Sequence, residues 1–415
     1  MKLRILILAS LCISTSALAG GYRVATQGQI ALGMGHTGVA ITESAETVFF
    51  NPAGMSFLDS DLSISAGTTL INSVAKYQNT SVNVAADTDN PIGTPINLYI
   101  SKKLNESSSY GLGIYTPYGN VVKWDRDWAG SHLINKIDLK TLYIQPTVSL
   151  RVNDKFSVGW GLTYVTGSVE FNRNLTTSLV DENGDRANVT VSTNQIDAWG
   201  YNVGFLAKPT KQFAIGISYR SRVDMRARDE KADFENIPTS MQSIFPDTTF
   251  DADLVLPAEL TVGVSYTLSP DTVLAFDINH AYWSAYESLD LQFKNGAGLS
   301  ENPRNYSDVN IYRIGIQHKV LSSLTIRGGA YFDESPIKDG YFAPETPRND
   351  SIGITAGASY SVSKRLDLDL SLLYLTFDEF SGSYDHYNQS GTLISFGGDY
   401  KSTVTAVGFG LNYKY

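Results

Sequence analysis

The 415-residue sequence has only one cysteine, Cys12, and it lies within an apparent secretory leader. Lys2 and Arg4 precede an apolar run from Ile5 to about Ile13, and Ala17-Leu18-Ala19 matches a small-x-small cleavage site. We therefore expect residues 1–19 to be a signal peptide that is removed. The mature chain would then have no thiol, no disulfide and no cysteine-ligated metal.

Long apolar runs and basic charge are also scarce. After the leader, no stretch is apolar over the ~20 residues that a membrane-spanning helix requires. Charged residues make up 18% of the chain, against a typical ~25%, and the mean hydropathy is -0.12. Without Lys2 and Arg4, the chain has 30 basic and 42 acidic residues, a net charge of -12 that argues against a nucleic-acid partner. A membrane location would therefore require a β-barrel, the other structure that satisfies its own backbone in lipid.

The sequence is dominated by a period of two, which is typical of strands. In one example, Leu368, Leu370 and Leu372 alternate with Asp369 and Ser371. About fourteen such segments occur, an even number as in bacterial barrels. They lie near 60–71, 95–103, 109–116, 138–152, 155–170, 191–208, 212–228, 250–267, 271–291, 308–320, 323–333, 350–363, 365–378 and 402–415.

The connections between these segments alternate between short turns and long polar loops. The long connections are expected near 72–94, 117–137, 171–190, 229–249, 292–307, 334–349 and 379–401. This alternation favours an outer-membrane barrel, whose short turns all lie at one end and whose long loops lie at the other.

A soluble β-sandwich would show the same alternation with its apolar face turned inward. Tyrosines near segment ends, such as Tyr110, Tyr266 and Tyr374, and a final alternating strand that ends on Tyr415 favour the membrane barrel. The predicted fold class is therefore all-β, a transmembrane antiparallel barrel over residues 60–415.

Residues 20–59 do not alternate and are rich in small residues. A barrel of this size has a lumen that is either water-filled or plugged. We therefore predict that residues 20–59 form a compact plug inside the barrel.

Several motifs, in their order along the chain, resemble the FadL family of outer-membrane transporters for long-chain fatty acids and aromatic hydrocarbons. The first is Glu43-x-Ala45 followed by Asn51-Pro52-Ala53-Gly54. Later ones are Tyr110-Gly111-Leu112-Gly113, Pro117-Tyr118-Gly119, Trp128-Ala129-Gly130, Leu256-Pro257-Ala258-Glu259 and 326–333. The resemblance implies a monomeric, fourteen-stranded channel in the Gram-negative outer membrane, among lipid and lipopolysaccharide, for passive uptake of hydrophobic compounds.

The resemblance also implies an N-terminal hatch that carries Asn51, Pro52, Ala53 and Gly54. It places this motif against an inward kink of the third strand, where a gap in the wall lets the ligand leave sideways. By position, the kink falls near Gly111, Gly113, Pro117 and Gly119, and glycine and proline suit an interrupted strand. The alternative for Asn51-Pro52 is an ordinary turn.

The loop 117–137 is unusually apolar. Its side chains Val121, Val122, Trp124, Trp128 and Leu133 suggest a ligand-binding groove, and the family places its first binding site in this loop. The alternative, equally weighted, is that the two tryptophans dip into the membrane interface.

A ligand carboxylate would need a cation in the lumen. Strand parity points Arg220, Arg313 and Arg327 inward, which makes them candidates. We favour the alternative that they pair with the inward carboxylates of Asp277, Asp367 and Asp369.

The sequence predicts no enzyme, cofactor or metal site. The five histidines lack metal spacing, and there is no nucleophile elbow or phosphate-binding loop. The acidic loop tips 87–90 and 181–185 could hold calcium, although exposed turns often have this composition. A general porin, a membrane-embedded hydrolase, or an adhesin or phage receptor acting through its loops are the competing functions. The sequence does not choose among fatty acids, alkanes and aromatic hydrocarbons.

Overall fold

The computed structural model describes residues 21–415. The predicted signal peptide, residues 1–19, and Cys12 lie outside the described residues. Within 21–415, none of the helices is long and apolar enough to span a membrane.

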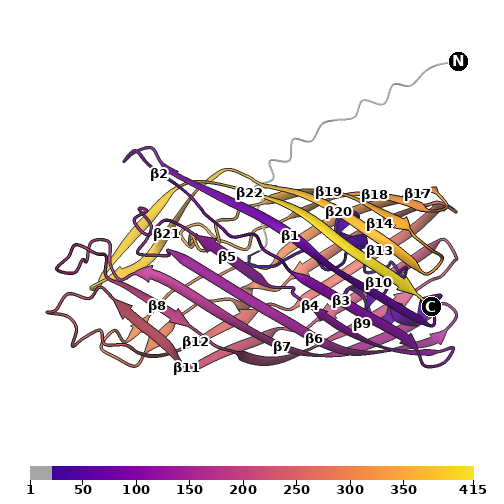
Figure 1. Cartoon of the computed structure of the whole chain (residues 1–415), viewed down its shortest axis with the longest axis horizontal. Coiled ribbons are helices and arrows are strands. Elements are labelled where there is room, and N and C mark those ends of the chain that lie inside the picture. The colour runs from indigo at the N-terminus through magenta and orange to yellow at the C-terminus, as the bar shows by residue number, and fades with distance from the viewer. Residues whose placement is uncertain (1–20) are drawn as a thin grey trace, which may run out of the picture.

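Fourteen antiparallel strands form a closed barrel (Figure 1), as the sequence predicts. The barrel closes because β1 pairs with β3 on one side and with the last strand, β22, on the other. The fourteen strands are β1(Leu62–Asn79), β3(Ile96–Lys103), β4(Ser108–Tyr115), β6(Lys136–Asn153), β7(Phe156–Asn174), β9(Ile196–Ala207), β10(Phe213–Arg220), β13(Glu259–Ser269), β14(Thr272–Ala281), β17(Val309–Leu321), β18(Leu324–Asp333), β19(Ser351–Ser361), β20(Leu366–Phe377) and β22(Thr392–Lys414).

The apolar face of the wall points outward, which rules out the soluble sandwich. In β20, Leu368, Leu370 and Leu372 are 48%, 42% and 46% exposed, whereas Asp369 and Ser371 are buried at 6% and 0%. A sandwich would bury the leucines instead. Large exposed apolar side chains recur in this way on strands all round the barrel, as a lipid-facing wall requires.

Short turns lie at one end of the barrel and long connections at the other, here called the long-loop end (Figure 1). The long connections contain further strands: β2(Val84–Asp87), β5(Gly119–Lys123), β8(Asn188–Ser192), β11(Val223–Glu235), β12(Thr248–Leu256), β15(Leu291–Phe293), β16(Leu299–Ser300) and β21(Phe380–Gln389), with the 3-10 turn η2(Trp283–Ala285).

Three predicted segments were much too long, and a fourth, 191–208, also takes in the end of β8 before β9 begins at Ile196. Segment 212–228 divides into β10 and β11, and segment 250–267 divides into β12 and β13. The two breaks lie beside each other. Arg220 pairs with Glu259 on the short-turn side of the breaks, and Val223 pairs with Leu256 on the long-loop side. Pro257, which has no N–H for the ladder, marks one of the breaks. The third segment, 271–291, ends as a strand at Ala281.

Residues 21–58 lie inside the ring of strands and hydrogen-bond to several sides of it. They form α1(Gln29–Gly33), α2(Thr47–Phe50) and the 3-10 helix η1(Pro52–Phe57), almost entirely buried. The backbone N–H groups of Gly38 and Val39 donate to Asp277 of β14, and the Gln29 side chain contacts β20 and β22.

The wall accommodates this segment through glycines. A Cβ atom on Gly329 of β18 would lie 2.2 Å from the backbone nitrogen of Gly35, which itself has a positive φ of 66°. No side chain fits in such a close backbone approach. The N-terminal segment and the wall are therefore packed backbone against backbone at this point.

Candidate functional site

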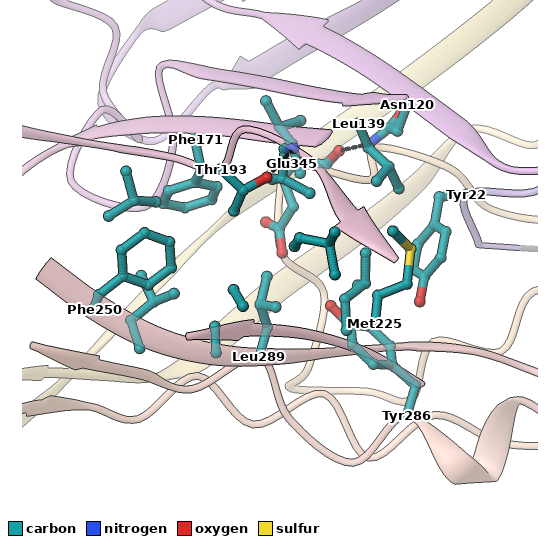
Figure 2. A pocket seen from close by; sticks show the side chains of 18 of the residues that line it. Tyr22, Asn120, Leu139, Phe171, Thr193, Met225, Phe250, Tyr286, Leu289 and Glu345 are labelled. Carbon is teal, nitrogen blue, oxygen red and sulfur yellow. Dashed lines mark hydrogen bonds between the residues drawn. The ribbon is translucent and has the colours of Figure 1, made fainter. Parts of the chain in front are cut away.

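An apolar cavity of about 60 Å³ (Figure 2) lies near the long-loop end, where Figure 1 places β8, β11 and β12. Its walls come from β6, β7, β8, β11, β12 and the segment around β15. β8 joins β7 to β11, and β12 joins β11 to β15, so that these strands form a continuous sheet round the cavity. Its lining is dominated by aliphatic and aromatic side chains, among them Leu139, Phe171, Met225, Phe250 and Leu289.

Tyr22 closes the cavity on the side of the N-terminal segment (Figure 2). Its ring packs edge-on against Trp283 at 4.8 Å and Tyr286 at 5.6 Å, and its hydroxyl donates to the carbonyl of Val255. Residue 22 thus ties the start of the described chain to the cavity.

The cavity has one carboxylate, that of Glu345, which comes from the connection between β18 and β19. One of its oxygens, Oε1, pairs with the buried guanidinium of Arg304. The only other polar lining side chains are Asn120, Thr193, Thr346 and two tyrosines. This arrangement suits a largely apolar ligand with a polar group at one point.

The third strand of the barrel is interrupted after β4. β4 ends at Tyr115, β5 begins at Gly119, and both pair with the same neighbour, β6. At the break, the chain hydrogen-bonds to the N-terminal segment instead: Val24 N donates to Pro117 O at 2.9 Å, and Gly119 N donates to Tyr22 O at 3.1 Å. The strand therefore turns into the lumen here.

A second cavity, of about 580 Å³, lies beside this break. On its inner side it is lined by Arg23, Ala25 and Tyr331, and at the wall by residues 91–96 and by Gly119 and Val121. Residues 93–95 hydrogen-bond to β1 rather than to β5. The wall is therefore incomplete between residues 91–96 and β5.

Two of the four residues predicted for the kink, Pro117 and Gly119, lie at this break or next to it. Gly111 and Gly113 lie within the regular part of β4, where a Cβ would come close to Met55 and Val48 of the N-terminal segment.

The motif Asn51-Pro52-Ala53-Gly54 lies elsewhere. The Asn51 amide donates to Val39 O at 2.8 Å and to Phe205 O of β9 at 3.0 Å, and its oxygen accepts from Ala53 N at 3.1 Å. Pro52 and Ala53 face Gly159 of β7 and Gly204 of β9. The structure thus places the motif against β7 and β9, and residues 22–27, not the motif, contact the kink.

The five residues predicted for the loop groove do not form one. Trp124 and Trp128 stack on each other with ring centroids 4.4 Å apart and are only 3% and 5% exposed, so they do not lie in the membrane interface either. Val122 is buried beside them, Leu133 packs on Tyr384 and Tyr387, and Val121 lines the second cavity. None of the five lines the first cavity.

Arg220, Arg313 and Arg327 point inward, but the expected ion pairs with Asp277, Asp367 and Asp369 are absent from the described residues. Arg220 donates to Tyr115 and to Phe49 O, and Arg327 donates to Gln317 and Ser359. The three carboxylates bind backbone N–H groups, serine hydroxyls, Asn412 or Lys414 instead. Arg313 has no hydrogen-bond or ion-pair partner within residues 21–415, and it lines a small cavity together with Arg23, Arg220 and Glu259.

Sequence reasoning missed Tyr22, Arg304 and Glu345. They lie far apart in the chain, outside the alternating strands, and no local spacing connects them. Three or more His, Cys, Asp or Glu residues do not gather anywhere in 21–415 in a way that could hold a metal ion, the acidic loop tips included.

Comparison with known proteins gives a consistent picture. Residues 10–415 match a family described as outer membrane protein transport protein (OMPP1/FadL/TodX). The chain is 23% identical to outer membrane protein P1 of Haemophilus influenzae, over 98% of this chain and 97% of that protein. It is 24% identical to a long-chain fatty acid transport protein of Salmonella typhi, over 97% and 95%.

Solved structures show the same fold. A Pseudomonas aeruginosa FadL homologue superposes with a TM-score of 0.82 at 18% identity, over 95% of this chain and 100% of that chain. The Pseudomonas putida toluene transporter TodX superposes with a TM-score of 0.72 at 17% identity, over 94% and 98%.

Proposed function

Because the chain belongs to the OMPP1/FadL/TodX family of outer-membrane transport proteins, we propose that it takes up hydrophobic compounds by passive diffusion and releases them sideways into the bilayer. The family membership and the barrel place the protein in the outer membrane as a transporter of hydrophobic compounds. We infer that it acts as a monomer among outer-membrane lipid and lipopolysaccharide, and not as an enzyme.

The observation that carries the proposal is the 580 Å³ cavity beside the interrupted third strand. It joins lumenal residues such as Arg23 and Tyr331 to the gap between residues 91–96 and β5. An apolar molecule gains ~0.8 kcal/mol for each CH₂ group that leaves water. Release through this gap into lipid would therefore keep it out of water and need no energy source.

We propose that residues 20–59 act as a hatch. Residues 21–58 lie inside the ring of strands, which opposes an open porin, and residues 22–24 hydrogen-bond to the kinked strand. The same residues include Tyr22, which closes the first cavity. Movement of this one segment would thus change both the cavity and the gap, with Asn51, Pro52, Ala53 and Gly54 anchoring its other end to β7 and β9.

The relatives leave two substrate classes open, since their names refer to long-chain fatty acids and to toluene. Of the three candidate arginines, Arg220 and Arg327 already donate to protein groups. Arg313 is the one whose donors are unused among the described residues. We propose that Arg313 contacts the anionic head group of a ligand in the lumen. Water would occupy this position when no ligand is bound.

Obstructing the gap tests the lateral route. Ala25→Trp and Val121→Trp would fill the second cavity, which both residues line. Val152→Trp is the matched control, because Val152 is exposed near the short-turn end of β6. The measurement is the initial rate at which cells lacking other such transporters accumulate radiolabelled oleate and toluene.

We expect the two obstructing variants to slow uptake about tenfold or more, equivalent to at least ~1.4 kcal/mol on the barrier. The control should transport like the wild type. Wild-type uptake rates in both obstructing variants, with folded protein in the membrane, would refute lateral exit. A wild-type protein that moves neither compound would refute the transport proposal itself.

A further inference from the structure

The first cavity contains a carboxylate of which only one oxygen has a partner in the protein. Its lining includes the Glu345 carboxylate and no lysine, arginine or histidine. Glu345 Oε1 pairs with Arg304, while Oε2 has no protein partner within residues 21–415. Figure 2 shows the carboxylate projecting between Phe250 and Met225, into the space that the apolar side chains surround.

The terminal nitrogens of Arg304 are directed to protein groups and not to a ligand, whereas its buried Nε has no partner within residues 21–415. One terminal nitrogen, Nη2, pairs with Glu345. The other, Nη1, donates to Tyr384 Oη and to the backbone carbonyls of Asn302 and Pro303, at 3.1–3.2 Å. Arg304 is only 4% exposed and does not line the cavity.

Three of the other polar side chains that line the cavity already have hydrogen-bond partners in the protein. The Asn120 side-chain amide donates to Glu345 O at 2.7 Å, Thr193 Oγ1 accepts from Val169 N at 2.9 Å, and the Tyr22 hydroxyl donates to Val255 O. Glu345 Oε2 is thus a free acceptor, bearing charge, in an apolar space.

These surroundings disfavour the binding of a charged carboxylate head group and favour the binding of a neutral hydroxyl. A ligand carboxylate would lose its hydration and add a second negative charge, which Arg304 does not neutralise because it is already paired with Glu345. An unpaired charge in an apolar site is costly. A neutral hydroxyl would instead donate to a charged acceptor, the stronger kind of hydrogen bond.

We propose that this cavity selects an apolar molecule that carries a neutral hydrogen-bond donor, such as an alcohol or a phenol, and discriminates against carboxylates, with Glu345 as the acceptor. This inference rests on the proposed function and specifies the ligand class at its first cavity. Arg313, in a separate cavity deeper in the lumen, shares no wall with it.

The test uses three ligands with a ten-carbon chain, of which only the head group and the nearest carbons fit in a cavity of about 60 Å³: 1-decanol, decyl methyl ether and decanoate. The alcohol has a hydrogen-bond donor, the ether has neither a donor nor a charge, and decanoate has a charge. Each displaces an apolar fluorescent probe from the full-length mature protein in nanodiscs at pH 8, where decanoate is ionised. We expect 1-decanol to bind about tenfold or more tighter than decanoate, with the ether between them.

The variant Glu345→Gln removes the charge and keeps an oxygen for Arg304. It should reduce the preference for decanol over decanoate several-fold. The control, Glu379→Gln, changes an exposed loop carboxylate and should keep the wild-type order.

Glu345→Gln leaves Arg304 without its ion pair and could impair folding, so the wild-type ligand series decides the matter independently. Decanoate binding as tightly as decanol in both the wild type and an Arg313→Gln variant, which lacks the proposed anion contact of the other cavity, would overturn the inference while leaving the transport proposal intact. Binding of none of the three ligands, with no uptake of oleate or toluene by cells, would refute both. If a folded Glu345→Gln variant binds the three ligands with the same order of affinities as the wild type, Glu345 does not set the preference.

Discussion

Neighbouring glycines on β18 offer a direct test of how the N-terminal segment is packed against the wall. Gly329 faces the lumen, and a Cβ added there would lie 2.2 Å from Gly35 N and 2.4 Å from Met34 C, both backbone atoms. Gly328 points outward, and its added Cβ would have Ile316 Cγ2 as nearest neighbour, at 4.0 Å. The same substitution, glycine to alanine, therefore overpacks one side of the strand and leaves the other unstrained.

The cost of Gly329→Ala follows from what must move. The backbone at Gly35 would have to retreat by about an ångström, and overpacking of this kind costs ~1–3 kcal/mol. The retreat would also stretch the hydrogen bond that Gly35 N donates to Thr355 Oγ1, now 2.9 Å long, and its loss would add ~1 kcal/mol. A total of ~2–4 kcal/mol corresponds to a population of displaced segment roughly 30-fold to several hundred-fold higher.

Two measurements detect this change. Equilibrium urea unfolding in detergent reports the loss of stability if the segment and barrel unfold together, and conductance in planar bilayers reports openings if the segment alone detaches. We expect Gly329→Ala to change at least one and Gly328→Ala to change neither. If both variants match the wild type in both measurements, residues 21–58 do not pack against Gly329 inside the barrel.

Three further predictions follow from the same structure. Asn51→Ala removes three hydrogen bonds of ~1 kcal/mol each, so brief conducting states should become more frequent in planar bilayers, and a trace like the wild type would speak against Asn51 as an anchor. Leu370→Arg places a charge on the lipid-facing wall at a cost of ~2–4 kcal/mol and should lower the heat-modifiable folded fraction on gels, whereas Leu393→Arg, in the β22 hairpin at the long-loop end, should not. Burial lowers the pKa of His132 to about 4, with Arg173 and Arg186 adding to the effect. The folded loop therefore holds His132 neutral, and the stability of the loop should fall by up to ~3 kcal/mol between pH 6.5 and pH 4. Hydrogen exchange should detect this loosening, and His132→Phe, which keeps the edge-to-face contact with Tyr387, should abolish it.

The wall of the barrel could be predicted from the sequence because its determinants are local. A residue's parity along a strand sets its face, so the alternation of Leu368, Leu370 and Leu372 with Asp369 and Ser371 already predicted one polar and one apolar face. The number of alternating segments predicted the strand count, and the alternation of short turns with long loops predicted a common end for the loops. What the alternation could not decide was which face met lipid, and the exposed fractions in β20 decided it.

The interior depended on contacts between segments that are distant in the chain. The sequence predicted Trp124 and Trp128 for a ligand-binding groove, yet in the structure the two rings stack on each other. Their indole N–H groups donate to the carbonyls of Pro344 and Ile134. The cavity instead gathers Tyr22, Phe250 and Glu345, which only the closed barrel brings together. A period of two along a strand fixes which face a side chain lies on, but it carries no information about the residues that this side chain contacts across the lumen. The sequence by itself therefore determined the wall, and only the tertiary structure decided the site.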